Sequence, residues 1–310
     1  MDKLSAMKTF VRVAEAGSFS AVATEAGTTQ SAVSKQVAAL ERVLGAKLFS
    51  RTTRSISLTE EGERYFESTR RLVAEIEEAE TGLRRNADQI TGWLRIAASV
   101  GFGRLKLMPV VKAFMEAHPQ VKIDLRLHDG FVDLIEQGID VSVRIGELQD
   151  SGLLARRVGS SRRLLLAHRS YLRRLPRKQA RPSHPDELHK HNCLVYTGQS
   201  NPNLWSFTAG PGAHEPAGTS RAVRVEGSLQ TNSSEVMRAA VLSGMGIGYS
   251  PDWLFEAELH SGEVQRLLPD WDSPRAPVHL VSPLQRRHSA KVKAFGDFVA
   301  SQLQWGASPS

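Results

Sequence analysis

TQSAVSKQVAALERVL, residues 29–44, has the pattern of one amphipathic helix with two chemically different faces. The apolar face consists of Val33, Val37, Leu40 and Leu44, and the polar face near the N-terminal end consists of Gln30, Ser31, Ser34 and Lys35. Spacings of three and four residues put each set on one side of a helix, so the apolar set is predicted to face a core. Glutamine, lysine and serine contact base edges or phosphates from the second helix of a helix-turn-helix. We therefore predict that this helix reads the major groove of double-stranded DNA.

Signals on both sides of this helix complete a winged helix-turn-helix over residues 1–58. Apolar residues at Leu4, Met7, Val11 and Ala14 predict a first helix that ends at Gly17. Ser20 is the expected N-cap of a second helix over residues 21–26, which Gly27 would close. Residues 47–58 are predicted to form two short strands around a basic tip, from which Arg51, Thr52 and Arg54 reach phosphates or the minor groove. A helical bundle with a polar surface would have to produce all these features by chance.

The composition agrees with a globular chain that meets a polyanion. The 310 residues are 41% hydrophobic and 24% charged, which is enough for two or three domains, and the net charge of +7 suits nucleic acid. Residues 156–181 hold ten Lys or Arg and no acid, and because no motif accompanies them we interpret them as a solvated face. No apolar run is long enough for export or for crossing a membrane, so we expect a cytoplasmic location and no membrane partner.

A heptad stripe runs through residues 59–91 and predicts a long linker helix. Its positions are Tyr65, Thr69, Leu72, Ile76, Ala79, Leu83, Asn86 and Ile90. Such a narrow stripe needs a partner helix, because a lone solvated helix would leave its apolar residues bare. We expect homodimerisation through Tyr65, Leu72, Ile76, Ala79 and Leu83, since two-fold symmetry joins two DNA half-sites.

From residue 92 the pattern changes to short apolar runs that alternate with helices. Strands are predicted at residues 94–98, 121–127, 141–144 and 193–196, and helices at residues 105–117, 131–137 and 234–242. This order is typical of an α/β domain with a largely parallel sheet. Ligands of such sheets bind beyond the carboxyl ends of the strands, often at helix N-termini, and Ser99 to Phe102 occupy such a place.

The sequence resembles the LysR-type transcriptional regulators. The N-terminal part of the resemblance lies in SFSAVA (18–23), TQSAVSKQV (29–37), LE (40–41), LGAKLFSR (44–51) and LTEEG (58–62). It continues in FVDL (131–134), DVSVRIG (140–146), LVY (194–196) and GMGIG (244–248) with Pro251. Thr28 departs from the pattern, because the family has an apolar residue there.

The resemblance implies the complete domain organisation. A winged helix-turn-helix (1–58) and a linker helix (59–91) would precede a two-lobed α/β domain (92–302) like a periplasmic binding protein, with a flexible tail at 303–310. Two crossings near Leu164 and Leu268 would divide that domain into lobe I (92–163 and 269–302) and lobe II (164–268). A small, acidic effector would bind between the lobes, and dimers would pair into homotetramers. The expected effector contacts are Ser99, Phe102, His128, Arg144, Tyr196 and Asn232, with Ser99 and Arg144 holding its acidic group. The base contacts would be Gln30, Ser31, Ser34 and Lys35, and the wing contact Arg54.

Other functions are weaker fits to the sequence. A redox or metal sensor would act through Cys193, yet His189, His191 and Cys193 lack a second ligand cluster, so we expect no metal and no cofactor. An enzyme attached to a DNA-binding module would need a catalytic spacing, and no Gly-x-Ser-x-Gly occurs. The glycines of GMGIG follow a predicted helix and enter a strand, the reverse of a dinucleotide fingerprint. A non-specific architectural DNA protein would bind without sequence preference.

Overall fold

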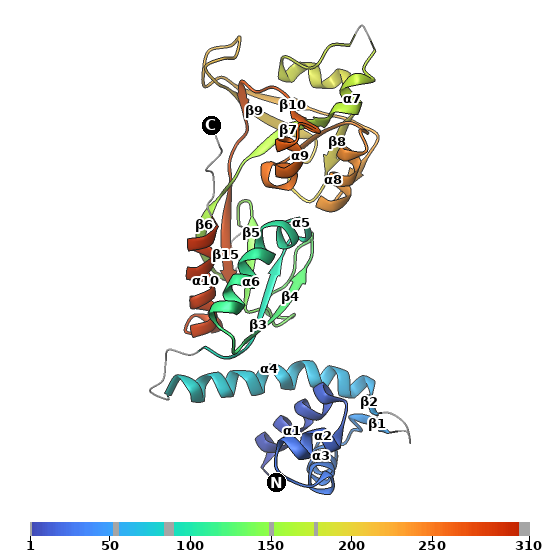
Figure 1. The fold of residues 1–310 in the computed structure, drawn as a ribbon, viewed down its shortest axis with the longest axis vertical. Helices are drawn as coiled ribbons and strands as arrows, with labels where there is room; N and C mark the ends of the chain where they lie inside the picture. The colour runs from blue at the N-terminus through green and yellow to red at the C-terminus, as the bar shows by residue number, and fades with distance from the viewer. Residues whose placement is uncertain (1, 52–55, 84–89, 149–151, 177–178, 304–310) are drawn as a thin grey trace. The chain divides into compact units, whose positions relative to one another are not determined.

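The computed structural model describes residues 2–51, 56–83, 90–148, 152–176 and 179–303, and the chain divides into two compact units, Met1–Gln89 and Ile90–Ser310 (Figure 1). The first unit contains α1 (Lys3–Ala16), α2 (Phe19–Glu25), α3 (Gln30–Leu44), the hairpin of β1 (Phe49–Arg51) and β2 (Ile56–Leu58), and α4 (Glu60–Leu83). These elements confirm the predicted winged helix-turn-helix fold. No described helix is both long enough and apolar enough to cross a membrane.

Side-chain caps fix where the first three helices begin. Asp2 accepts from the backbone of Leu4 at 3.1 Å, and Thr29 accepts from the backbone of Ala32 at 3.2 Å. The prediction for α2 was wrong by two residues, because Ser18 and not Ser20 is the N-cap. Ser18 has the extended conformation that a cap needs, and the helix then begins at Phe19, which buries its ring in the core.

Aromatic rings hold the first unit together. The ring of Phe10 lies 5.4 Å from that of Phe49 and 5.5 Å from that of Tyr65, so α1, the hairpin and α4 share one core. Gly62 allows α4 to approach the hairpin, since a Cβ atom there would lie 2.0 Å from the carbonyl oxygen of Leu48. The start of α4 is therefore fixed to the rest of the first unit.

The second unit contains two five-stranded sheets. In the first, the order is β4 (Val121–Leu127), β3 (Gly92–Ala98), β5 (Val141–Ile145), β15 (Ala276–Ser282) and β6 (Leu154–Ser161). In the second, the order is β11 (Gln230–Thr231), β8 (Cys193–Tyr196), β12 (Ile247–Pro251), β7 (Arg163–His168) and β13 (Val264–Arg266). A third sheet joins β10 (Ser220–Arg224), β9 (Leu204–Ala209) and β14 (Trp271–Asp272).

The sheets are mixed and not largely parallel. β3 runs parallel to β4 and β5, but β15 runs antiparallel to β5 and β6, and β7 antiparallel to β12. The sequence pattern could not reveal this arrangement, because the antiparallel partners are far apart in the chain. The difference leaves the α/β fold class unchanged.

Helices cover the sheets of both lobes. Those of the first are α5 (Val100–Phe102), a π-helical turn (Gly103–Leu107), α6 (Met108–Ala117) and α10 (Ala290–Gln302). Those of the second are α7 (Arg169–Arg173), α8 (Ser234–Leu242), α9 (Glu256–His260) and the 3-10 turns Pro185–Lys190 and Asp252–Phe255. A further 3-10 turn is Leu284–Arg286.

The predicted helix at residues 131–137 is wrong. Residues 134–138 form a turn instead, and the Asp133 carboxylate that precedes it accepts from the backbone N–H groups of Ile135 and Glu136. Gly138 then takes a φ of 62°, which ends the turn before a helix can propagate.

The chain crosses twice between the lobes. It leaves the first sheet at Ser161 and enters the second at Arg163, close to the expected Leu164. The return follows Trp271–Asp272 and reaches β15 at Ala276, a few residues beyond the expected Leu268.

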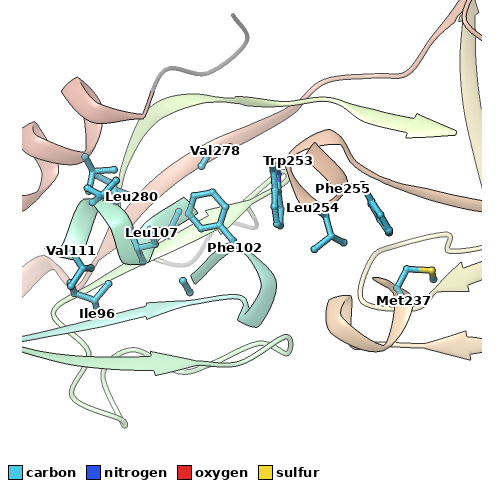
Figure 2. Packing of buried hydrophobic residues seen from close by; sticks show 14 of the residues in the cluster. Ile96, Phe102, Leu107, Val111, Met237, Trp253, Leu254, Phe255, Val278 and Leu280 are labelled. Carbon is cyan, nitrogen blue, oxygen red and sulfur yellow. The ribbon is translucent and has the colours of Figure 1, made fainter. Parts of the chain in front are cut away.

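A common core joins the lobes. Phe102 of the first lobe and Trp253 of the second pack edge to face with ring centroids 5.4 Å apart, as Figure 2 shows. The Trp253 indole also donates to Ser161 Oγ at 3.0 Å, beside the first crossing.

Candidate functional site

The two faces of α3 have the predicted burial. Val33, Val37 and Leu40 are buried, while Gln30, Ser31 and Lys35 are exposed. Ser34 and Leu44 are half-buried. The N-terminal half of α3 therefore presents polar side chains to solvent, and this arrangement is suited to contact with base edges.

Polar contacts fix α3 relative to the rest of its unit. Gln36 donates to Ser5 Oγ at 2.7 Å and accepts from Thr9 Oγ1 at 2.9 Å, which ties α3 to α1. At the other end, the Glu41 carboxylate accepts from the backbone of Leu48 at 2.9 Å and pairs with Lys47 at 3.1 Å. These contacts fix the position of α3 relative to α1 and to the start of the hairpin.

Glu41 keeps its charge in this setting. Burial acts to raise the pKa of its carboxyl group, but the backbone donors of Leu48 and Phe49 and the Lys47 ammonium outweigh it and lower the pKa below the ordinary 4.5. A carboxylate at this position therefore holds the start of the hairpin at neutral pH.

The strands of the predicted wing are present, and Arg51 pairs with Ile56 in their register. The tip, including Thr52 and Arg54, lies outside the described residues, as does the side chain of Arg51. Their contacts with DNA remain predictions.

The heptad stripe on α4 has a part that packs within its own unit and a part that is exposed. Tyr65 packs on Phe10, and Thr69 is buried, so this first part of the stripe covers the helix's own unit. Leu72 is 44% exposed and Ile76 half-buried, which leaves apolar surface for a partner. The side chains of Ala79 and Leu83, and all of Asn86, lie outside the described residues. The apolar character of the stripe at Tyr65 is thus explained by packing within the chain.

A cavity of about 960 Å³ lies at the carboxyl ends of β3, β4, β5 and β8. Four of the six residues predicted to contact an effector line it: Ser99, His128, Arg144 and Tyr196. Ser99 and His128 directly follow strands and Tyr196 ends one, while Arg144 is the last residue but one of β5. These positions agree with the rule for open sheets. Further lining from the second lobe includes Arg163, Tyr249 and Trp253, so both lobes contribute walls.

Phe102 and Asn232 do not line the cavity. Phe102 has no exposed surface, and its ring lies in the core shared by the lobes (Figure 2). Asn232 is exposed, because Ser233 caps α8 and turns the chain so that Ser234 lines the cavity in its place. The resemblance to the LysR-type regulators suggested both residues, and the structure places neither of them in the lining.

Asp129 is a lining residue that the sequence gave no reason to select. Its carboxylate accepts from the backbone of Val100 at 3.0 Å and from the backbone of Ser234 at 2.9 Å. The Ser234 hydroxyl also donates to Asp129 at 3.2 Å. One carboxylate therefore joins the first turns of α5 and α8, which belong to different lobes.

Cys193 and its neighbouring histidines have structural contacts. The thiol is fully buried, and burial raises its pKa to about 12, which keeps it from the reactive thiolate form. His191 lies beside Tyr171 and Gln179, whereas His189 contacts the carbonyl of Asp186. In the described ranges, no group of three or more His, Cys, Asp or Glu could hold a metal ion.

Two family models match the chain. Residues 4–63 match the bacterial regulatory helix-turn-helix protein, lysR family, and residues 87–304 match the LysR substrate binding domain.

Similar proteins extend over nearly the whole chain. A transcriptional regulator of Xanthomonas campestris is 34% identical over 96% of this chain and 85% of its own. The regulator CrgA of Neisseria meningitidis is 32% identical over 95% of both chains.

Solved structures give the same picture. CrgA is similar with a TM-score of 0.59 and 31% identity over 97% of this chain and 98% of its own. The full-length Vibrio cholerae virulence activator AphB is similar with a TM-score of 0.58 and 28% identity over 97% of this chain and 99% of its own.

Proposed function

The chain belongs to the LysR family of bacterial transcriptional regulators, and on that premise we propose how its own residues bind DNA and an effector. α3 reads a half-site through Gln30, Ser31, Ser34 and Lys35, while Arg51, Thr52 and Arg54 of the wing hold the backbone or the minor groove. The observation that supports this division is the exposed polar end of α3 above a buried apolar face. The protein acts in the cytoplasm by binding, without catalysis.

The effector is a small acidic molecule in the cavity between the lobes. Ser99, His128, Arg144 and Tyr196 contact it, and the Arg144 guanidinium pairs with its acidic group. Arg144 is held in place by the carbonyl of Val132, to which it donates at 2.9 Å, and by the Phe131 ring, whose centroid is 4.8 Å away. A preformed cation of this kind reduces the ordering cost of binding an anion.

The protein assembles as a dimer, and dimers pair into tetramers. Leu72 and Ile76 supply the apolar surface on α4. The heptad spacing of the sequence predicts that Ala79 and Leu83 continue it. Two recognition helices then read the halves of a pseudo-palindrome. An effector that favours one arrangement of the lobes changes the geometry of the paired wings on DNA.

Footprinting on the DNA that flanks the protein's own gene tests this function. The purified protein should protect a two-fold symmetric site, and a small carboxylate from a panel should change the extent of protection. Protection of random DNA to the same degree would instead favour an architectural protein. Consumption of the carboxylate would indicate an enzyme.

A further inference from the structure

Arg163 occupies the point where the chain enters the second lobe, and its main chain is fixed there. Its backbone N–H donates to Ser273 Oγ at 3.1 Å, and Ser273 Oγ donates back to its carbonyl at 2.6 Å. The side chain lines the cavity, with its guanidinium carbon 5.9 Å from the centroid of the Tyr249 ring. Arg163 is therefore a second cation in the effector cavity, anchored independently of Arg144.

Neither guanidinium has a carboxylate partner in the cavity. Over the described part of the chain, no carboxylate lies within ion-pair distance of Arg144 or Arg163, although Asp133 acts on Arg144 through space. Asp129 is an acid in the lining, but its carboxylate already accepts hydrogen bonds from the backbone N–H groups of Val100 and Ser234. Glu147 also lines the cavity but is exposed.

The neighbours of Arg163 do not compensate its charge. Tyr249 and Tyr196 both line the cavity, and burial raises the pKa of each phenol, for Tyr249 to about 12. Both phenols are therefore neutral at physiological pH. Partial burial removes water from the Arg163 guanidinium and lowers its pKa, yet arginine stays protonated. A half-buried cation without a partner anion is less favourable than one that an anion has bound.

We infer that the effector carries two separate acidic groups on one small carbon skeleton, one bound by Arg144 and the other by Arg163. This inference rests on the proposed function of the cavity. A ligand with a single carboxylate leaves one of the two guanidiniums unpaired, whereas a diacid pairs with both. Arg144 lies on β5 of the first lobe and Arg163 on β7 of the second, so a diacid also bridges the lobes.

Calorimetric titration of the full-length protein tests the inference. Succinate and glutarate are compared with butyrate and valerate, which match their chain lengths but carry one acidic group. We expect the diacids to bind about tenfold more tightly or better. The R163Q variant should reduce diacid affinity to that of the monoacids and leave monoacid affinity unchanged.

The matched control is R162Q. Arg162 is adjacent in sequence, but it pairs with Asp252 at 3.7 Å and does not line the cavity. Diacid affinity should be unchanged in this variant. R163K, which keeps a charge without the fork of donors, should bind diacids with intermediate affinity and should melt like the wild type.

The possible failures are distinguishable. Equal affinity for diacids and monoacids, or an R163Q variant with unchanged diacid affinity, overturns the inference and leaves the acidic effector in place. If inorganic phosphate binds more tightly than either diacid, the cavity recognises one tetrahedral anion and not two separate acidic groups. That result also overturns the inference. If no carboxylate binds, the proposed acidic effector and the inference both fail.

Discussion

At the scale of single residues, buried polar groups determine geometry that hydrophobic patterns leave open. Glu41 lies on the inward side of α3, next to Leu40, and hydrophobic periodicity assigns it no role. The structure gives it the backbone N–H groups of Leu48 and Phe49, which would otherwise be buried without an acceptor. The orientation of the hairpin relative to the recognition helix thus depends on one carboxylate.

Replacing Glu41 with alanine should lower the free energy of unfolding by about 1–3 kcal/mol at neutral pH, because two backbone donors lose their acceptor. The folded pKa lies below the ordinary 4.5, so the carboxylate's stabilisation is complete above that value and is lost as pH falls through the folded pKa. The E41Q variant removes the charge but keeps the shape of the side chain. Its free energy of unfolding should therefore be lower than that of the wild type at neutral pH, and this difference should shrink in acid. Urea unfolding of both proteins at pH 7 and at pH 3 measures it. A constant difference would contradict the ionic role.

At the scale of elements, the parts of the fold with strong local signals could be predicted from the sequence. The bounds of β4, β8 and α8 agree with prediction, since each is a clear apolar run or face between turn residues. α2 was displaced because both Ser18 and Ser20 can cap, and only burial of Phe19 chooses between them. Arg163 was grouped with a solvated basic face, since only the crossing between lobes brings it to the cavity. Long-range packing was the missing information in both cases.

The polar end of α3 and the wing should contribute differently to DNA binding. K35A and Q30A should reduce the preference for the true site over scrambled DNA by about 1–3 kcal/mol each, because we propose that these two residues contact bases. R54A should weaken both DNAs similarly and lower the salt dependence. Fluorescence anisotropy with both DNAs over a salt series separates the effects. An equal loss of specificity in all three variants would refute this assignment, and K3A, on an exposed position of α1, serves as a charge-matched control.

The remaining apolar face of α4 predicts that the dimer depends on this helix. Replacing Leu72 and Ile76 together with aspartate should produce monomers, because two charges would enter an apolar helix pair. Light scattering gives the mass. Glu67 is exposed on the same helix, so E67D is a control that should remain dimeric. A dimer that persists in the double variant at micromolar concentration would place the interface elsewhere.

At the scale of the whole regulatory unit, the two lobes are joined by contacts of different kinds. The apolar contact of Phe102 with Trp253 is independent of charge. Polar contacts add to it, since Arg104 pairs with Glu235 at 3.0 Å and Asp129 binds Ser234. Because Asp129 also lines the cavity, an effector that changes its contacts would change the link between the lobes.

Removing the Asp129 carboxylate should therefore loosen the lobes without unfolding them. D129A leaves the backbone N–H groups of Val100 and Ser234 without their acceptor, and hydrogen bonds to a charged group are worth about 1.5–3 kcal/mol. Amide hydrogen exchange should accelerate about tenfold or more at residues 100–103 and 234–237, while the centres of β3 and β8 stay protected. E136Q removes one exposed carboxylate from the following turn and should exchange like the wild type. If the D129A variant exchanges like the wild type in both segments, the apolar core alone holds the lobes together, and an effector would have to act on Trp253 and its neighbours.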